Sequence, residues 1–150
     1  MDSQMTLPMN FEKFVYDFIN EKVTVVLVNN QFVTGTLLNV RPDFIQVLET
    51  YRVRNVCNMP EVFSVVIHYK TENNLDFFHY PMSRLFKKFN SFLGKVVEIT
   101  RESNRKNKII GKLIYIGSNY FVITNRDEKW IACVLLSDDT IVKQVWWFLN

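Results

Sequence analysis

Apolar and polar positions follow one another along this chain in short runs that predict one helix and then five strands. Residues 11–19 place apolar side chains at steps of three and four, which puts them on one face of a helix. The period then changes to that of strands, over five β-branched segments, 22–28, 32–40, 44–50, 53–59 and 62–69. Turn residues separate these segments, with Asn29-Asn30 after the first and Pro42 after the second.

The same order then occurs a second time. Ser83 is a suitable N-cap for a helix that Gly94 ends, and five further segments follow, 95–100, 108–116, 120–125, 129–136 and 141–148. The two halves also match in sequence, because residues 33–40 are echoed by 109–116 and Gly111 stands 76 positions after Gly35. A repeat of this length predicts two similar small domains, which we place at 11–69 and 83–148 with a linker at 70–82.

Further positions of the first copy also have counterparts in the second. At the offset of 76, Cys57 falls on Cys133. Upstream, Lys22-Val23 falls on Lys95-Val96 at an offset of 73, which predicts a first hairpin three residues longer in the second copy. Gly35 and Gly111 lie inside strands, where a glycine usually marks a bend. A small sheet needs such a bend when it curls into a barrel.

The second and third strands of the first copy carry a resemblance to a known family. Residues 33–37, followed by Asp43-Phe44 and a third strand, resemble the first motif of the Sm-like fold of Sm proteins and bacterial Hfq. The resemblance implies a mainly β fold of two tandem Sm-like small β-barrels, each an N-terminal helix followed by five strongly bent antiparallel strands. The Arg-Gly pair with which the second Sm motif contacts RNA is absent, since 56–60 and 132–136 stand at its place.

A second resemblance covers nearly the whole chain, from about residue 11 to residue 148. Residues 18–25 and 111–120 are similar to the starts of the two repeats of Bacillus spore coat protein CotB and of small related proteins from spore-forming bacteria. This likeness implies a structural component of the spore coat, with other coat proteins as partners. The Gly-Gly-Pro-type turn of that family is replaced here, and we expect no role that depends on its Ser/Lys/Arg-rich tail.

Charge and cysteine content exclude few partners but favour an intracellular origin. The net charge of +3 is mild, so contact with an anionic partner is permitted and not required. We expect synthesis in the cytoplasm without a signal peptide, because residues 1–10 lack a basic start and an apolar run. We also expect no membrane segment, because no apolar run approaches the ~20 residues of a membrane span. Cys57 and Cys133 are expected to be buried thiols in a reducing compartment, and neither histidine, His68 nor His79, has ligand spacing to them.

Candidate chemistry is sparse, and each candidate has a structural alternative. Four cations, Arg101, Arg105, Lys106 and Lys108, could hold phosphates weakly or could be a solvated hairpin tip. The aromatic run 77–80 could stack on bases or pack the linker between the domains. Asp138-Asp139 is better explained as a turn than as an acid–base pair. We expect no catalytic residues, no metal and no cofactor, and therefore no enzyme.

Strand edges give the final prediction. The fourth and fifth strands of an Sm-like domain expose unpaired backbone groups, and such an edge can pair with another chain. One junction can be made inside a tandem chain, which leaves one free edge in each copy. The candidate edge residues are Val53, Val56, Met59, Val145, Trp146, Trp147 and Phe148. Pairing from head to tail gives a ring or a filament.

Three functions remain open at this point. The first is a non-enzymatic structural or assembly protein that oligomerises through strand edges, as in a spore coat. The second is an RNA-binding or nucleotide-binding protein of the Sm and Hfq kind. The third is a phage-encoded or host adaptor that sequesters a ligand.

Overall fold

The computed structural model describes residues 10–49, 53–68, 84–125, 127 and 129–146, so the predicted linker and its aromatic run lie outside the described residues. The first copy consists of α1 (Phe11–Tyr16), β1 (Lys22–Leu27), β2 (Phe32–Val40), β3 (Phe44–Leu48), β4 (Arg54–Asn58), the 3-10 turn η2 (Met59–Glu61) and β5 (Val62–His68). The second copy consists of α2 (Arg84–Phe89), the 3-10 turn η3 (Asn90–Phe92), β6 (Val96–Arg101), β7 (Asn104–Ile116), β8 (Tyr120–Thr124), β9 (Trp130–Leu135) and β10 (Thr140–Gln144).

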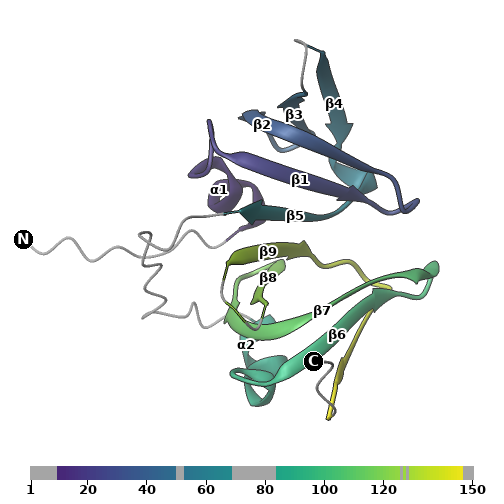
Figure 1. Ribbon diagram of the computed structural model, residues 1–150. Coiled ribbons are helices and arrows are strands. Elements are labelled where there is room, and N and C mark those ends of the chain that lie inside the picture. The colour runs from purple at the N-terminus through teal and green to yellow at the C-terminus, as the bar shows by residue number, and fades with distance from the viewer. Residues whose placement is uncertain (1–9, 50–52, 69–83, 126, 128, 147–150) are drawn as a thin grey trace, which may run out of the picture.

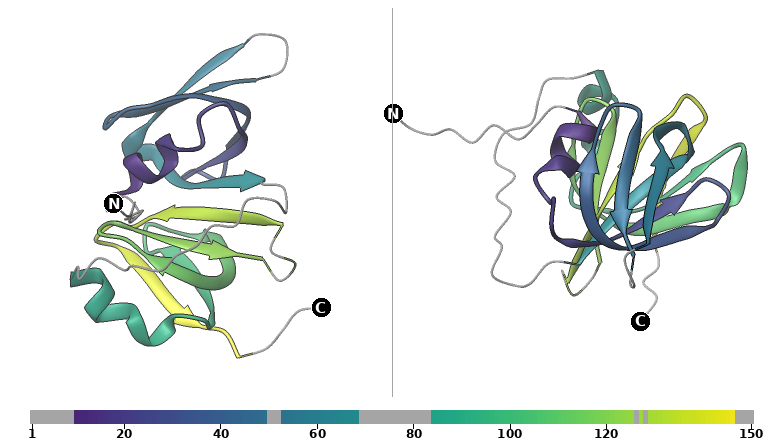
Figure 2. Two further views of the ribbon diagram at one scale, coloured as in Figure 1. Left: turned by 90° about the vertical axis from the view of Figure 1, so that its left-hand side faces the viewer. Right: turned by 90° about the horizontal axis from the view of Figure 1, so that it is seen from above.

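All ten strands join in one open antiparallel sheet, in the order β10-β6-β7-β8-β9-β5-β1-β2-β3-β4. The two copies lie one above the other in Figure 1, with β5 of the first beside β9 of the second. Figure 2 shows the same two strands side by side from another direction. The mainly β prediction is therefore confirmed. Two tandem Sm-like barrels are not confirmed, because a single open sheet runs through both copies, and the domain bounds 11–69 and 83–148 stay a prediction.

The copies share one internal strand order, which makes their residues comparable. Each has its fifth, first, second, third and fourth strands in that sequence across the sheet. Gly35 lies opposite Val23 in the first copy, and Gly111 lies opposite Val97 in the second. A side chain on either glycine would collide with the facing carbonyl, of Leu48 or of Thr124, so both glycines allow the same close approach of strands.

These registers correct the alignment at the start of each copy. Val97 stands 74 positions after Val23, so the offset there is 74 and the prediction of 73 was wrong. The hairpin of the second copy is therefore longer by two residues and not by three. It is also mostly strand, because β7 begins at Asn104 and only Glu102 and Ser103 make the turn.

The fourth strands correct the pairing of the cysteines. Ile45 lies opposite Cys57, whereas its counterpart Phe121 lies opposite Val134. Cys57 therefore corresponds to Val134, and Cys133 stands one residue earlier in its strand. Since neighbouring strand residues face opposite sides of a sheet, the slip of one residue turns Cys133 away from the core that contains Val134 and into the core that contains Cys57. Both thiols are buried and free, and burial raises the pKa of each.

Two apolar cores lie on the two faces of this sheet, and each takes side chains from both copies. The core under α1 is built mainly by the first copy but includes Tyr115, Tyr120 and Cys133. The core under α2 belongs mainly to the second copy but includes Phe63 from β5. The copies are thus joined by shared packing as well as by a ladder. No helix in the described part of the chain is long and apolar enough to span a membrane.

Candidate functional site

The junction between the copies is a continuous backbone ladder. Five residue pairs join β5 to β9, from Ser64 opposite Val134 to His68 opposite Trp130. β5 is the fifth strand of its copy and β9 is the fourth strand of its copy. This is the junction inside the chain that the strand-edge argument predicted, and it leaves β4 and β10 at the two ends of the sheet.

Arg101 holds the end of this ladder. Its Nη2 donates to the carbonyl of Val62, at 3.3 Å, and to that of Leu135, at 3.0 Å, so the guanidinium bridges the two copies. The guanidinium also lies over the Phe63 ring, 5.6 Å from its centroid. Arg101 is 9% exposed, and burial lowers its pKa. The guanidinium therefore has a structural role at the junction, which the sequence alone did not predict.

Two asparagines from the second copy hold the end of β1. Asn104 Nδ2 donates to the carbonyl of Val28 at 2.6 Å, and Asn107 Nδ2 donates to that of Leu27 at 2.7 Å. These carbonyls lie where β1 leaves its regular register with β5. A buried polar residue in a strand, as Asn107 is, was the sequence signal that could have identified this contact.

Aromatic packing closes the other end of the junction. Asn119 Oδ1 accepts a hydrogen bond from the Phe11 N–H at 2.8 Å, which ties α1 to the loop before β8. The ring centroids of Phe14 and Tyr120 lie 5.3 Å apart, and both side chains are buried. Burial raises the pKa of Tyr120 far above its usual value. The junction is thus held by buried aromatic packing as well as by its backbone ladder.

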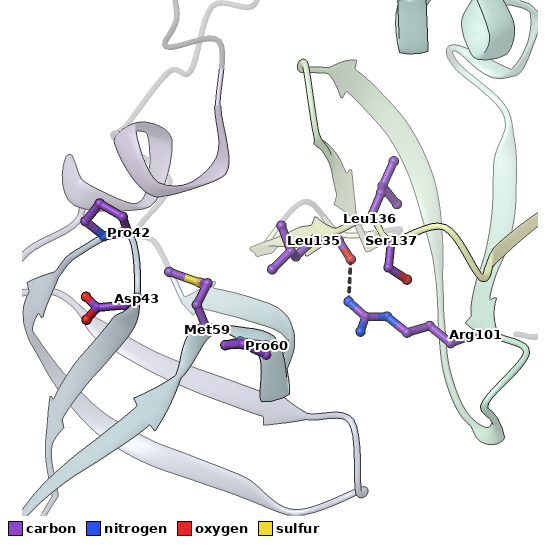
Figure 3. Close-up of a pocket in the computed structure, with 8 residues that line it drawn as sticks. All are labelled: Pro42, Asp43, Met59, Pro60, Arg101, Leu135, Leu136 and Ser137. Atoms are coloured by element: carbon purple, nitrogen blue, oxygen red, sulfur yellow. Dashed lines mark hydrogen bonds between the residues drawn. The ribbon is translucent and has the colours of Figure 1, made fainter.

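An open groove of about 430 Å³ crosses the junction on the Arg101 side (Figure 3). Its walls are mostly apolar, with Arg101 and Asp43 as the charged side chains in the lining. The lining residues are Pro42, Asp43, Met59, Pro60, Arg101, Leu135, Leu136 and Ser137. Figure 3 shows the Arg101 guanidinium turned toward the Leu135 carbonyl.

The four predicted phosphate contacts are not brought together as one patch. Arg105 pairs with Glu102 at 2.7 Å, with both side chains more than half exposed. Lys108 Nζ lies 3.8 Å from Glu98, and Lys106 is exposed. The pairing of β7 with β6 shifts register between Asn104 and Lys108, so these cations do not form one regular row along the strand. Arg101 is buried as well, so fewer of the four cations are available to a phosphate. The phosphate contact stays an untested prediction.

The predicted edge residues lie on the two outermost strands or next to them. Val53 is 51% exposed, Val56 57% and Trp146 80%, whereas Met59 and Val145 are half-buried. Trp147 and Phe148 lie outside the described residues. Among the described strands, β4 pairs only with β3 and β10 only with β6, so each has one open side.

The residues weighed for catalysis have structural explanations. His68 is exposed at the end of the β5–β9 ladder. Asp139 Oδ2 accepts from the Ser103 N–H at 3.1 Å, and its Oδ1 accepts from the Ser137 hydroxyl, which ties two turns together. Interactions with the Ser103 side chain, the Ser137 side chain and the Ser103 backbone hold the pKa of Asp139 at about 2. In the described ranges, no three His, Cys, Asp or Glu side chains gather as metal ligands would.

The Asp139 bonds lead to a prediction about acid stability. A carboxylate with a lowered folded-state pKa stabilises the fold above its unfolded pKa of about 4 and loses that effect as pH falls toward about 2. We expect Asp139→Asn to lower the melting temperature at pH 7, and the difference from wild type to shrink between pH 4 and pH 2. Asp138→Asn is the matched control and should show neither effect. A difference that stays constant down to pH 2 would contradict this account.

Comparisons of the chain with family models, with curated proteins and with solved structures found no match.

Proposed function

We propose that this chain is a non-enzymatic assembly protein that joins copies of itself from head to tail through β4 and β10. One observation carries the proposal. The sheet ends in a fourth strand, β4, and a fifth strand, β10, and the chain already joins a fourth strand to a fifth at β9–β5. The two open edges, β4 and β10, are thus equivalent to the two strands that already pair inside the chain. A spore coat component is the specific form that the sequence resemblance implies.

The open sides of both strands present backbone groups that bond to no other described strand. The Met59 N–H bonds to the Asp43 carbonyl and the Glu49 N–H to that of Val53, so Asn55 and Cys57 face β3. Arg54, Val56 and Asn58 therefore turn their N–H and carbonyl groups outward. On β10, the Val145 N–H bonds to the Val96 carbonyl, so Val142 and Gln144 face outward in the same way.

Within the described residues, the two edge strands of one chain cannot pair with each other. Eight strands separate β10 from β4 in the sheet, and they lie at opposite ends of the molecule in Figure 1. Exposed edges of this kind act as templates for pairing with another chain. Because the two edges differ, pairing is from head to tail, and the product is a ring if the rotation closes and a filament if it does not.

A second candidate function, RNA or nucleotide binding, is favoured in the described residues by the exposed cations Arg105, Lys106 and Lys108 of β7. Contacts of this type are sequence-tolerant and weaken steeply with salt. The apolar groove at the junction offers a place for a ligand, but its guanidinium is engaged by two carbonyls.

The test is the molar mass of the purified chain by light scattering, with and without added RNA. We expect masses at multiples of 17.9 kDa that rise with protein concentration, and an absorbance ratio of protein alone. A monomer throughout the micromolar range would overturn the assembly proposal. RNA that co-elutes, and is lost when Arg105, Lys106 and Lys108 are changed to alanine, would favour the second candidate.

A further inference from the structure

We infer that the junction between neighbouring chains has the register of the internal junction but is held by charge where the internal one is held by aromatic packing. The outer junction is consequently reversible and salt-sensitive. This inference rests on the proposed function, and it specifies which residues of a second chain meet β4, β10 and α2.

The register follows from the correspondence of the two copies. Val142 is the counterpart of Val65, because the equivalent residues Ile99 and Val25 lie opposite them. Val56 lies opposite Gln46, and Cys133 lies opposite Val122. Gln46 and Val122 are equivalent at the offset of 76, so Val56 is the counterpart of Cys133. Val65 lies opposite Cys133 in the internal junction. The outer pairs, each between β10 of one chain and β4 of the next, are therefore Ile141 with Cys57, Val142 with Val56, Lys143 with Asn55 and Gln144 with Arg54.

The polar bridges of the internal junction are mostly missing from the outer one. Arg101 corresponds to Leu27, whose side chain has no hydrogen-bond donor and cannot bridge two carbonyls. Asn104 lies in the β6–β7 hairpin, within the part that makes it two residues longer than the β1–β2 hairpin. It therefore has no counterpart in the first copy. Asn107 corresponds to Gln31, so one of the three bridging side chains is retained as an amide.

The helix contact changes most. Asn20 and Gly94 both have a positive φ and both donate to the equivalent carbonyls of Leu37 and Leu113, which fixes an offset of 74 for the helices. At this offset Phe14 corresponds to Lys88.

The residues that Phe14 contacts in the internal junction are also replaced in the outer junction. Tyr120 corresponds to Phe44, and Asn119 corresponds to Asp43. Where the internal junction packs Phe14 on Tyr120 beside Asn119, the outer junction places Lys88 against Phe44 and Asp43 of the next chain.

The charges of the two faces are complementary at this point. α2 has three exposed cations, Arg84, Lys87 and Lys88, and no acid, while Asp43 is exposed in the loop before β3. Arg41 in the same loop offsets part of the attraction. An ion pair at a partly exposed site contributes modestly and is screened by salt. The outer junction can thus open while the internal one, bonded by Arg101 and packed aromatic rings, stays closed.

Disulfide formation tests the register. Val65 and Cys133 are a hydrogen-bonded pair, since the Leu136 N–H bonds to the Asn119 carbonyl and the alternation follows from it. The outer pair Ile141 and Cys57 is then a non-hydrogen-bonded pair with Cα atoms about 4.5 Å apart, which a disulfide can span. Under a mild oxidant, Ile141→Cys should give linked dimers and higher multimers on a non-reducing gel. Val142→Cys is the matched control, because its side chain faces the other side of the sheet and should give none.

Charge reversal tests the contact between α2 and the loop. Asp43→Lys and Lys88→Asp should each weaken association about five- to tenfold in light scattering at low salt, and the double variant should recover most of it. Lys87→Asp is the control on the neighbouring helix position and should have little effect. Association of the wild type should weaken as salt rises.

The outcomes separate the two proposals. If the wild type does not assemble, the proposed function fails. If it assembles but Ile141→Cys gives no link, or Val142→Cys links equally well, the register is wrong. If it assembles and neither Asp43→Lys nor Lys88→Asp changes the association, the charged contact is wrong while the strand-edge assembly stands.

Discussion

Replacing Val56 with proline is expected to convert the assembly into monomers. The Val56 N–H points to the open side of β4, because the flanking residues Asn55 and Cys57 are the ones that bond to β3. Proline removes that donor and puts its ring where the backbone of a neighbouring strand would lie. The ladder inside the chain loses no hydrogen bond, so the monomer should remain folded. Light scattering measures the mass, and circular dichroism measures the folded state.

Two further variants of β4 separate the edge from the strand itself. Val56→Thr keeps the N–H and the branched shape, so it should still assemble. Asn55→Pro removes a donor that bonds to β3 and should instead lower the melting temperature. If Val56→Pro ran at the wild-type mass, β4 would not be the assembling edge, and the proposed function would lose its main support.

The large features of this fold could be predicted from the sequence because local sequence patterns determine them. Period-two runs with turn residues between them gave all ten strands, and the echo of 33–40 in 109–116 located two equivalent glycines. The β5–β9 junction was also predictable, since two copies with complementary edges in one chain bring one such pair into reach.

Single-residue registers were beyond the same reasoning. Cys57 and Cys133 match by identity, yet the ladders align Cys57 with Val134, because each strand is set by its cross-strand neighbours and not by the matching letter. Arg101 looked like a member of a basic turn. Its burial depends on the Val62 carbonyl, 39 positions away, and no local pattern reports such a partner.

The second large effect is expected from Arg101→Met. Methionine keeps most of the apolar volume but leaves the carbonyls of Val62 and Leu135 without their donor at a buried strand end. Hydrogen bonds from a charged donor contribute more than neutral ones, while removal of a buried charge returns part of the loss. We expect the free energy of unfolding to fall by about 2 kcal/mol in urea titration. Arg105→Met is the control, since that side chain is 68% exposed and its loss should change stability by at most ~0.5 kcal/mol.

The shape of the unfolding curve adds a second measurement. Because Arg101 bridges the two copies, its loss weakens the junction more than either core, and the single transition should broaden as the copies begin to unfold separately. The phosphate-binding interpretation predicts the reverse pattern, with unchanged stability in Arg101→Met and loss of RNA binding that Arg105→Met shares. An unfolding midpoint that does not move would therefore show that the guanidinium is available to a ligand and that the junction is held by its ladder and aromatic packing alone.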